Sequence, residues 1–250
     1  MKAMILAAGL GTRLRPLTND RPKALVEVGG RTLLEITLTR LRGFGVREVM
    51  VNVHYFADMV VDYLKANQNF GMRVEVSHEA ELLETGGGLK KAAWFFTNSD
   101  GDAKEEAPFI VHNVDVVSTI DLGRMAQFHG ETQALATLAV QVRDTSRYLL
   151  FDERMRLRGR REGRDGKSEV VGTSSQVKAL AFSGVHIISP RIFSMMTEDG
   201  VFSIIAAYLR LAALGEKILA FRADEYYWRD LGKAENVAQA EQDFKNKVFW

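Results

Sequence analysis

Residues 3–18 of the 250-residue chain read AMILAAGLGTRLRPLT, and a Pro-Lys pair follows at residues 22–23. The apolar run at residues 3–7 has the length of a buried strand, and such runs suit parallel sheets covered on both faces. Gly9 and Gly11 then let the backbone turn tightly and approach a ligand. Backbone N–H groups in such a turn form an anion-binding nest, to which Arg13 and Lys23 add full charges. The stretch predicts a strand followed by a polyphosphate cradle.

Two better-known phosphate motifs do not fit this turn. The dinucleotide-binding fingerprint requires a third glycine where this chain has Leu14. The P-loop requires a Gly-Lys-Ser/Thr sequence, which the stretch lacks. A dinucleotide-dependent oxidoreductase is a rival interpretation of the strand and the glycines, and the charges of Arg13 and Lys23 speak against it.

The segments after the turn alternate between helical and strand periodicity. Residues 32–44 have apolar side chains at near-helical spacing, and Thr32 with Glu35 fits a capping box at the start of this helix. A strand, a helix and a third strand are predicted at residues 48–53, 56–68 and 72–77. Strands and helices that alternate in this way form right-handed βαβ units and a mostly parallel sheet.

Two aspartates are candidate metal ligands. Residues 109–112 predict a central strand, and Asp115 follows it at the edge where open α/β sheets place their ligands. Mg²⁺ takes one or two carboxylates together with substrate phosphates, although a turn or helix cap is an alternative role for a lone Asp. Asp230 lies in the sequence YWRDLG at residues 227–232, where composition alone favours a core strand.

Two stretches with glycines are candidate binding segments. Residues 83–88 read LETGGG and predict a tight loop that opens a helix, with free N–H groups for a base or a phosphate. An ordinary flexible loop is the other interpretation. Residues 178–188 predict a strand interrupted at Gly184, which indicates a bulge or a close backbone approach. His186 in this run is interpreted as a core histidine rather than a catalyst.

Composition limits the possible functions. The chain has 46% hydrophobic and 26% charged residues and no cysteine, which excludes disulfides, thiolate chemistry and Cys-ligated metals. The net charge of +1 gives no general attraction to nucleic acid or lipid, and no apolar run approaches the roughly 20 residues of a membrane span. With no signal peptide at the start, we expect a cytoplasmic protein without nucleic-acid or membrane partners.

Two polar segments are predicted to be exposed. Residues 98–107 are acidic and predict a loop, and residues 148–171 are rich in arginine. Acidic side chains are interleaved with these arginines and aromatic ones are scarce, so a solvated β-excursion is favoured over a nucleic-acid-binding patch.

The string L-A-A-G-x-G-T-R-L-x-P-L-T from Leu6, with the following P-K, resembles the signature of sugar-nucleotide pyrophosphorylases, the nucleoside-triphosphate:sugar-1-phosphate nucleotidyltransferases. E-x-E-x-L-E-T-G-G-G from Glu79 resembles the nucleotide-base loop of this family, and W-x-D-x-G from Trp228 its second metal motif. Val114 departs from the pattern, because glycine is usual there.

The resemblance implies an α/β fold, a three-layer αβα Rossmann-like sandwich. Its mixed, mostly parallel central sheet would be like that of glycosyltransferases of the A type, and no C-terminal β-helix is expected. We expect one nucleotidyltransferase domain over residues 1–250, with a nucleotide half at roughly 1–115 and a sugar-binding half at roughly 116–250.

The resemblance also implies a reaction and the residues that perform it. A nucleoside monophosphate passes from a nucleoside triphosphate to a sugar-1-phosphate, Mg²⁺ assists an in-line displacement, and pyrophosphate leaves. The short form looks nearest to N-acetylmuramate-1-phosphate uridylyltransferases and mannose-1-phosphate guanylyltransferases, so UTP or GTP is expected, in a monomer or small homo-oligomer. The implied site residues are Arg13 and Lys23 for catalysis; Leu6, Ala7, Ala8, Gly9, Gly11, Thr12, Arg13, Lys23, Glu84, Gly86 and Gly87 for the nucleotide; Asn113 and Gly184 for the sugar; and Asp115 and Asp230 for the metal. A catalytically silent nucleotide or sugar-nucleotide sensor on the same fold is the alternative.

Overall fold

The computed structural model describes residues 1–97, 107–171 and 176–246, so most of the predicted loop at residues 98–107 lies outside the described residues. The strands of the central sheet are β1 (Lys2–Leu6), β4 (Glu48–Val53), β5 (Arg73–His78), β6 (Phe109–Asn113), β8 (Ala136–Gln141), β9 (Arg147–Phe151), β10 (Leu157–Glu162), β11 (Ser168–Val170), β12 (Lys178–Ile188) and β13 (Ile218–Arg222). Two short ribbons lie outside it, formed by β2 (Glu27–Val28) with β3 (Arg31–Thr32), and by β7 (Val116–Ser118) with β14 (Trp228–Asp230).

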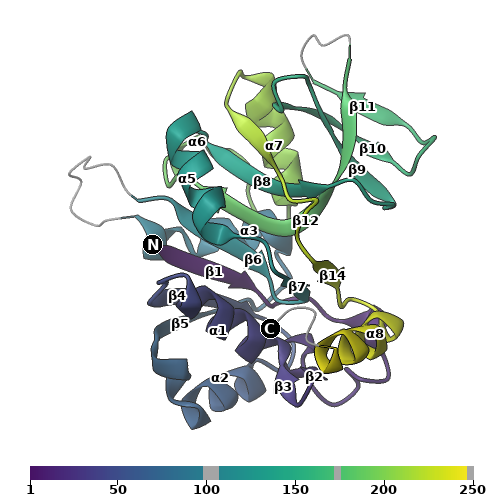
Figure 1. Cartoon of the computed structure of the whole chain (residues 1–250). Helices are drawn as coiled ribbons and strands as arrows, with labels where there is room; N and C mark the ends of the chain where they lie inside the picture. The colour runs from purple at the N-terminus through teal and green to yellow at the C-terminus, as the bar shows by residue number, and fades with distance from the viewer. Residues whose placement is uncertain (98–106, 172–175, 247–250) are drawn as a thin grey trace.

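The helices are α1 (Leu33–Gly43), α2 (Ala57–Ala66), α3 (Glu84–Lys91), α4 (Ala93–Phe96), α5 (Leu122–Thr132), α6 (Ile192–Met195), α7 (Ile204–Ala213) and α8 (Ala234–Lys245). Short 3-10 turns lie at Thr12–Leu14, Lys23–Leu25 and Gln68–Gly71. Figure 1 shows α1 and α2 on one side of the sheet and α3 and α7 on the other.

The sheet is mixed, as expected. Its strands run in the order β11-β10-β9-β12-β6-β1-β4-β5, with β8 and β13 attached to β12 off this path. The strands β6, β1, β4 and β5 run parallel to one another, as does β13 to β8. The long strand β12 pairs antiparallel with β6, β8 and β9, so the first half of the chain and the second share one sheet.

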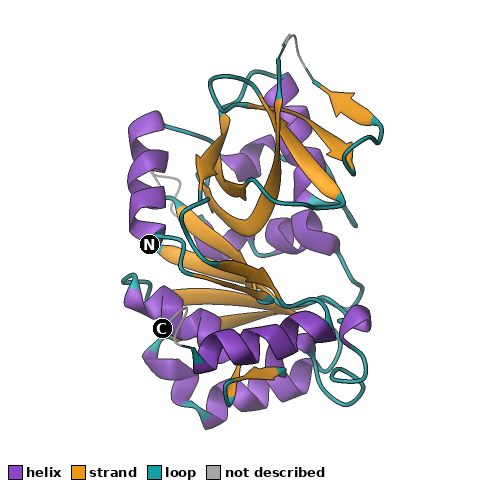
Figure 2. Ribbon diagram, turned by 45° about the vertical axis from the view of Figure 1, so that its right-hand side comes forward, coloured by secondary structure: helices purple, strands orange, loops and turns teal. Residues whose placement is uncertain are grey.

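Two apolar cores cover the two faces of the sheet. Ala3 and Ile5 of β1 lie in one core, beneath α1, α2, α5 and α8, whereas Met4 lies in the other, beneath α3, α4, α6 and α7. Successive residues of a strand point to opposite faces, which is why a continuous apolar run suits this position. The three-layer αβα architecture is confirmed, with helices on both sides of the strands (Figure 2).

The start of α1 follows the predicted cap. Thr32 Oγ1 accepts a hydrogen bond from Glu35 N at 3.0 Å, which satisfies one of the free N–H groups of the first turn. The Glu35 carboxylate does not complete the capping box but accepts from Arg31 Nε at 2.7 Å and from Tyr63 OH at 3.2 Å. Packing holds the helix more than the cap does, because each buried aliphatic side chain on it contributes about 1.5–3 kcal/mol.

The LETGGG segment differs from its prediction, because the three glycines lie inside α3 rather than in a loop before it. Gly86, Gly87 and Gly88 are buried where the helix passes close to neighbouring backbone and side chains. A Cβ on Gly86 would lie 2.3 Å from the ring of Phe202, and one on Gly88 would lie 2.6 Å from Glu79 Oε1. Glycine is required here by close packing rather than by a flexible turn.

We expect Gly87→Ala to lower the free energy of unfolding by about 1–3 kcal/mol, the usual range for overpacking. A Cβ on Gly87 would lie 2.3 Å from the backbone oxygen of Gly200, which cannot rotate away as a side chain can. Urea unfolding measures the change. Gly130→Ala in α5 is the matched control, since its Cβ would meet nothing within 4 Å, and alanine gains up to about 1 kcal/mol in a helix. Wild-type stability of Gly87→Ala would contradict this packing.

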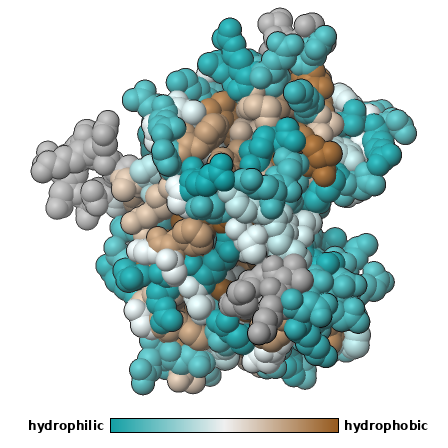
Figure 3. All heavy atoms as spheres, in the orientation of Figure 1, coloured by the Kyte–Doolittle hydropathy of each residue, from teal (hydrophilic) through white to brown (hydrophobic). Residues whose placement is uncertain are grey.

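No helix in the described part of the chain is both long and apolar enough to span a membrane. The face shown in Figure 3 is mainly hydrophilic, with hydrophobic residues gathered in small patches.

Candidate active site

The glycine turn after β1 is held by its own backbone. Gly11 has a φ of 64°, in the left-handed region that favours glycine, and its carbonyl oxygen accepts from Leu14 N at 2.8 Å and from Thr18 Oγ1 at 2.9 Å. Leu14 is fully buried in the core beneath α1, whereas Arg13 is exposed. Leu14, at the position of the third glycine of a dinucleotide motif, therefore packs into the core and fixes the turn. Arg13 lies on the open side of the turn.

Two buried polar side chains support this turn, and the site residues inferred from the sequence include neither. Ala7 N donates to Asn52 Oδ1 at 2.8 Å, and Asn52 Nδ2 donates to Glu79 Oε1 at 2.7 Å. Glu79 Oε2 accepts from Leu83 N at 3.0 Å, so the chain of hydrogen bonds joins β1 to the segment before α3. Asn52 is a polar residue in the apolar part of β4, between Val51 and Val53, and an amide at such a position is the signal that could have marked it.

The N–H groups of Gly86 and Gly87 are not free, so that expectation is wrong. Both donate to the carbonyl oxygen of Phe202, at 2.9 and 3.2 Å, because the segment before α7 packs against the start of α3. Glu84 begins α3 with an exposed side chain. The contribution of Glu84, Gly86 and Gly87 to nucleotide binding stays a prediction, and the structure assigns the two glycines a packing function.

Asp115 and Asp230 lie side by side at the end of the sheet. Asp115 separates β6 from β7, and Asp230 ends β14, which pairs with β7 so that Val116 lies opposite Asp230. A Cβ built on Gly232 would lie 2.8 Å from Asp230 Oδ1, 3.4 Å from Asp115 Oδ2 and 3.0 Å from Arg13 Nη2. Two carboxylates and a guanidinium from three distant segments therefore surround one point, and the glycine leaves the space between them.

The charges at this point are closely balanced. Lys23 Nζ donates to Asp115 Oδ2 in an ion pair that is largely buried. Burial, and then the negative charge of Asp115, raise the pKa of Asp230, while the Gly232 N–H, Lys23 and Arg13 act against this rise. An additional positive charge beside the two carboxylates would relieve their repulsion.

The two carboxylates fit a hard divalent cation. Oxygen ligands suit Mg²⁺, which keeps several positions for water or substrate phosphate and so does not need an all-protein cage. In residues 1–97, 107–171 and 176–246 no group of three or more His, Cys, Asp or Glu side chains gathers around one point. A metal held here would therefore complete its shell from substrate oxygens.

A cavity of about 380 Å³ adjoins the carboxylates. It is lined by Leu6, Thr85, Asn113, Asp115, Val116, Arg143, Thr145, Arg147, Tyr148, Leu149, Arg160, Arg161, Glu162, Phe182, Gly184, His186, Ser203, Ile204, Ile205, Trp228 and Asp230. Asn113 and Gly184 meet in its wall, since a Cβ on Gly184 would lie 2.9 Å from Asn113 Nδ2. Gly184 has a φ of 73° and marks a shift of register between β12 and β8, which confirms the predicted interruption of this strand.

Arg143 and Trp228 form a feature of the cavity that the sequence analysis missed. The Arg143 guanidinium carbon lies 3.6 Å from the centroid of the Trp228 ring, and Arg143 Nη2 donates to Phe182 O at 2.6 Å. Trp228 Nε1 in turn donates to Ser183 O at 2.7 Å, which fixes the indole beside the interruption of β12. No local pattern marks Arg143, because it lies in a loop that only the folded chain brings to Trp228.

Val114, in place of the usual glycine, fits without strain. Its side chain is buried in the core beneath α1, its backbone has no positive φ, and its N–H donates to Leu6 O at 3.1 Å. His186 is buried, as expected, with Nδ1 2.7 Å from Tyr208 OH.

Comparison with known proteins assigns the chain to a class of enzymes. The family model "Nucleotidyl transferase" matches residues 2–161, and the chain belongs to this family. It is 35% identical over 248 residues to N-acetylmuramate alpha-1-phosphate uridylyltransferase of Caulobacter vibrioides, covering 96% of this chain and 95% of that protein.

More distant relatives share the fold. Mannose-1-phosphate guanyltransferase of Yarrowia lipolytica is 30% identical over 93% of this chain, which spans 61% of that protein. The crystal structure of HddC from Yersinia pseudotuberculosis complexed with GMP-PN has a TM-score of 0.74 at 25% identity and covers 97% of this chain and 99% of that one. These similarities confirm the predicted family and the transferase class.

Proposed function

We propose that this enzyme transfers a nucleoside monophosphate from a nucleoside triphosphate to a sugar-1-phosphate. A phosphate oxygen of the sugar forms a bond to the α-phosphorus, the bond to the β-phosphate breaks, and pyrophosphate leaves. The attacking oxygen is already anionic, so no Ser, Cys or His nucleophile is needed. The observation that supports the proposal is the convergence of Asp115, Asp230, Arg13 and Lys23 beside a cavity of about 380 Å³.

The roles follow from charge and position. Arg13, on the open side of the glycine turn, holds the phosphates that leave as pyrophosphate. Asp115 and Asp230 would hold Mg²⁺, which when bound neutralises charge on the reacting phosphates. Lys23 pairs with Asp115 beside the proposed metal position, where its positive charge would reduce the repulsion between two polyanions during an in-line displacement.

We propose uridylyl transfer to a sugar-1-phosphate that carries a further anionic group, such as N-acetylmuramate 1-phosphate. Besides the two metal carboxylates, the charged side chains that line the cavity are four arginines and one glutamate: Arg143, Arg147, Arg160, Arg161 and Glu162. Guanidinium groups bind carboxylates in a bidentate manner, and the muramyl lactyl group supplies one. The similarity to the Caulobacter uridylyltransferase supports the same choice.

A pyrophosphate-release assay with Mg²⁺ tests the proposal. We expect turnover with UTP and N-acetylmuramate 1-phosphate, and slower turnover with N-acetylglucosamine 1-phosphate, which lacks the carboxylate. Turnover only with GTP and mannose 1-phosphate would favour guanylyl transfer, as the similarity to the GMP-PN complex allows. Nucleotide binding without pyrophosphate release would favour the silent sensor.

We expect Arg147→Gln to raise the KM for N-acetylmuramate 1-phosphate by about 10–100-fold, the value of a charge-assisted hydrogen bond of about 1.5–3 kcal/mol. The KM for N-acetylglucosamine 1-phosphate should change much less. Steady-state kinetics with both acceptors measures this difference. Arg154→Gln is the control, because Arg154 lies on the same hairpin outside the cavity. An equal change for both acceptors would show that Arg147 does not recognise the carboxylate.

A further inference from the structure

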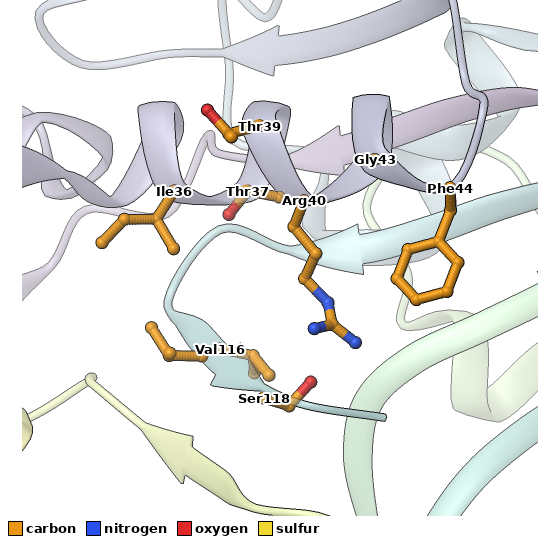
Figure 4. Close-up of a pocket in the computed structure, with 9 residues that line it drawn as sticks. Ile36, Thr37, Thr39, Arg40, Gly43, Phe44, Val116 and Ser118 are labelled. Carbon is orange, nitrogen blue, oxygen red and sulfur yellow. The ribbon is translucent and has the colours of Figure 1, made fainter. Parts of the chain in front are cut away.

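A second cavity, of about 260 Å³, lies between α1 and β7 (Figure 4). It is lined by Ile36, Thr37, Thr39, Arg40, Gly43, Phe44, Val116, Val117 and Ser118. Nothing in the proposed transfer reaction uses it. Its size is just below the range of about 300–1,000 Å³ for pockets that hold drug-sized ligands, so it suits a small molecule.

Two buried polar atoms of this cavity have no hydrogen-bond partner within the described residues, namely Arg40 Nε and Ser118 Oγ. Figure 4 shows the Arg40 side chain reaching from α1 toward β7, with the Ser118 hydroxyl turned toward the guanidinium. Buried polar groups are nearly always paired, and leaving one unpaired costs about 1–3 kcal/mol. Both atoms therefore indicate a missing partner in the space between them.

The charge of Arg40 is poorly compensated. Its Nη2 donates to Ile120 O, and its guanidinium carbon lies 5.4 Å from the centroid of the Phe44 ring. Burial lowers the pKa of Arg40 to about 10, and the charge of Asp121 opposes that shift. A carbonyl and an aromatic ring are weak partners for a buried cation, so an anion would be favoured here.

The chemistry of the wall specifies the kind of anion. One guanidinium and one hydroxyl match a carboxylate, whose single negative charge they balance, whereas a phosphate dianion would leave a surplus charge in a partly apolar site. Ile36, Phe44, Val116 and Val117 offer an apolar surface to the rest of such a molecule.

The cavity touches the ribbon that carries the proposed metal ligands. Val116 follows Asp115 directly, lies opposite Asp230 in the β7–β14 pair, and lines both this cavity and the substrate cavity. A ligand that displaces β7 therefore acts on the spacing of the two carboxylates.

We propose that the cavity between α1 and β7 is a second ligand site, for a small organic carboxylate, and that its occupant alters metal binding at Asp115 and Asp230. The carboxylate accepts from Arg40 Nε and Ser118 Oγ, and its apolar body packs against Phe44 and Ile36. The coupling to the metal rests on the proposed function, whereas the binding does not.

Benzoate is the probe, and the methyl NMR signals of Val117 and Ile36 report its binding in protein without metal or nucleotide. Both residues line this cavity and not the substrate cavity. We expect saturable shifts, with affinity lowered at least about tenfold by Arg40→Met and severalfold by Ser118→Ala. Arg42→Met, on an exposed residue of the same helix, is the matched control and should leave the affinity unchanged. Absence of methyl shifts in the wild type, or equal shifts in Arg40→Met, would overturn the proposal.

Thermal unfolding separates this function from a purely structural one. If Arg40 awaits an anion, benzoate raises the Tm of the wild type and leaves that of Arg40→Met unchanged, whatever the loss of the bond to Ile120 O does to the Tm in buffer. If Arg40 serves only to bridge to Ile120, Arg40→Met lowers the Tm and benzoate has no effect, which overturns the proposal.

The coupling has its own measurement. If the two sites are coupled, saturating Mg²⁺ changes the affinity for benzoate by some factor. By linkage, saturating benzoate then changes the affinity for Mg²⁺ by the same factor. We expect Mg²⁺ to change the affinity for benzoate at least about twofold, which is a weaker coupling than the roughly 5–150-fold that is typical. An unchanged benzoate affinity with Mg²⁺ bound would overturn the coupling. The methyl signals do not depend on turnover, so an inactive enzyme would refute the proposed function and leave this site standing.

Discussion

Asp115→Asn should lower the kcat of nucleotidyl transfer by about a thousandfold, which corresponds to about 4 kcal/mol of transition-state stabilisation. The substitution keeps the size of the side chain and an oxygen for Lys23 Nζ, but it removes the negative charge that would bind Mg²⁺. Charge on the phosphates grows as pyrophosphate departs, so the loss falls mainly on kcat rather than on KM.

Pyrophosphate release at saturating UTP, acceptor and Mg²⁺ measures this effect, and far-UV circular dichroism checks the fold. Asp62→Asn, on an exposed residue of α2, is the control and should leave kcat unchanged. Near-full activity of Asp115→Asn would show that this carboxylate does not act in the reaction.

The second large effect is a loss of stability in mild acid, caused by buried histidines. Burial lowers the pKa of His112 to about 4, assisted by the charge of Arg40, and that of His186 to about 3, assisted by His112. An unfolded histidine titrates near 6.5, so between about pH 6.5 and 4 the unfolded chain binds protons that the folded chain does not. The contribution of these histidines to the free energy of unfolding therefore has its full value above pH 6.5 and decreases as the pH drops toward 4.

The expected loss is about 1.4 kcal/mol per pH unit for each of these two histidines once the pH is well below 6.5. Urea unfolding at pH 7 and pH 5 measures it. His186→Gln should reduce the slope of the free energy of unfolding against pH by about 1.4 kcal/mol per pH unit, which corresponds to one proton. His78→Gln, on an exposed residue, should leave this slope unchanged. A protein equally stable at pH 5 and pH 7 would contradict the burial of neutral histidines.

The sequence predicts those parts of the site that depend on local chain geometry or on long motifs. The turn around Gly11 and the cap at Thr32 each form within a few residues, so both can be recognised in the sequence without knowledge of the fold. Asp115 and Asp230 are 115 residues apart, counted by their numbers in the chain, and only the resemblance to a family joined them.

The features that sequence analysis missed arise from packing between distant segments. The hydrogen bonds that link Ala7, Asn52 and Glu79, and the stacking of Arg143 on Trp228, each need three-dimensional proximity that no local spacing encodes. The N–H groups of Gly86 and Gly87 looked free for the same reason, since Phe202 lies more than a hundred residues further along the chain.

The long strand β12 determines how the molecule can move. It is hydrogen-bonded to β6, which leads to Asp115, to β9, which lines the cavity beside the two carboxylates, and to β8. A rotation between these parts would break a whole row of ladder hydrogen bonds, each contributing about 0.5–1.5 kcal/mol. The proposed donor and acceptor subsites thus share one continuous sheet, and we expect substrates to enter and products to leave without the opening of a hinge between them.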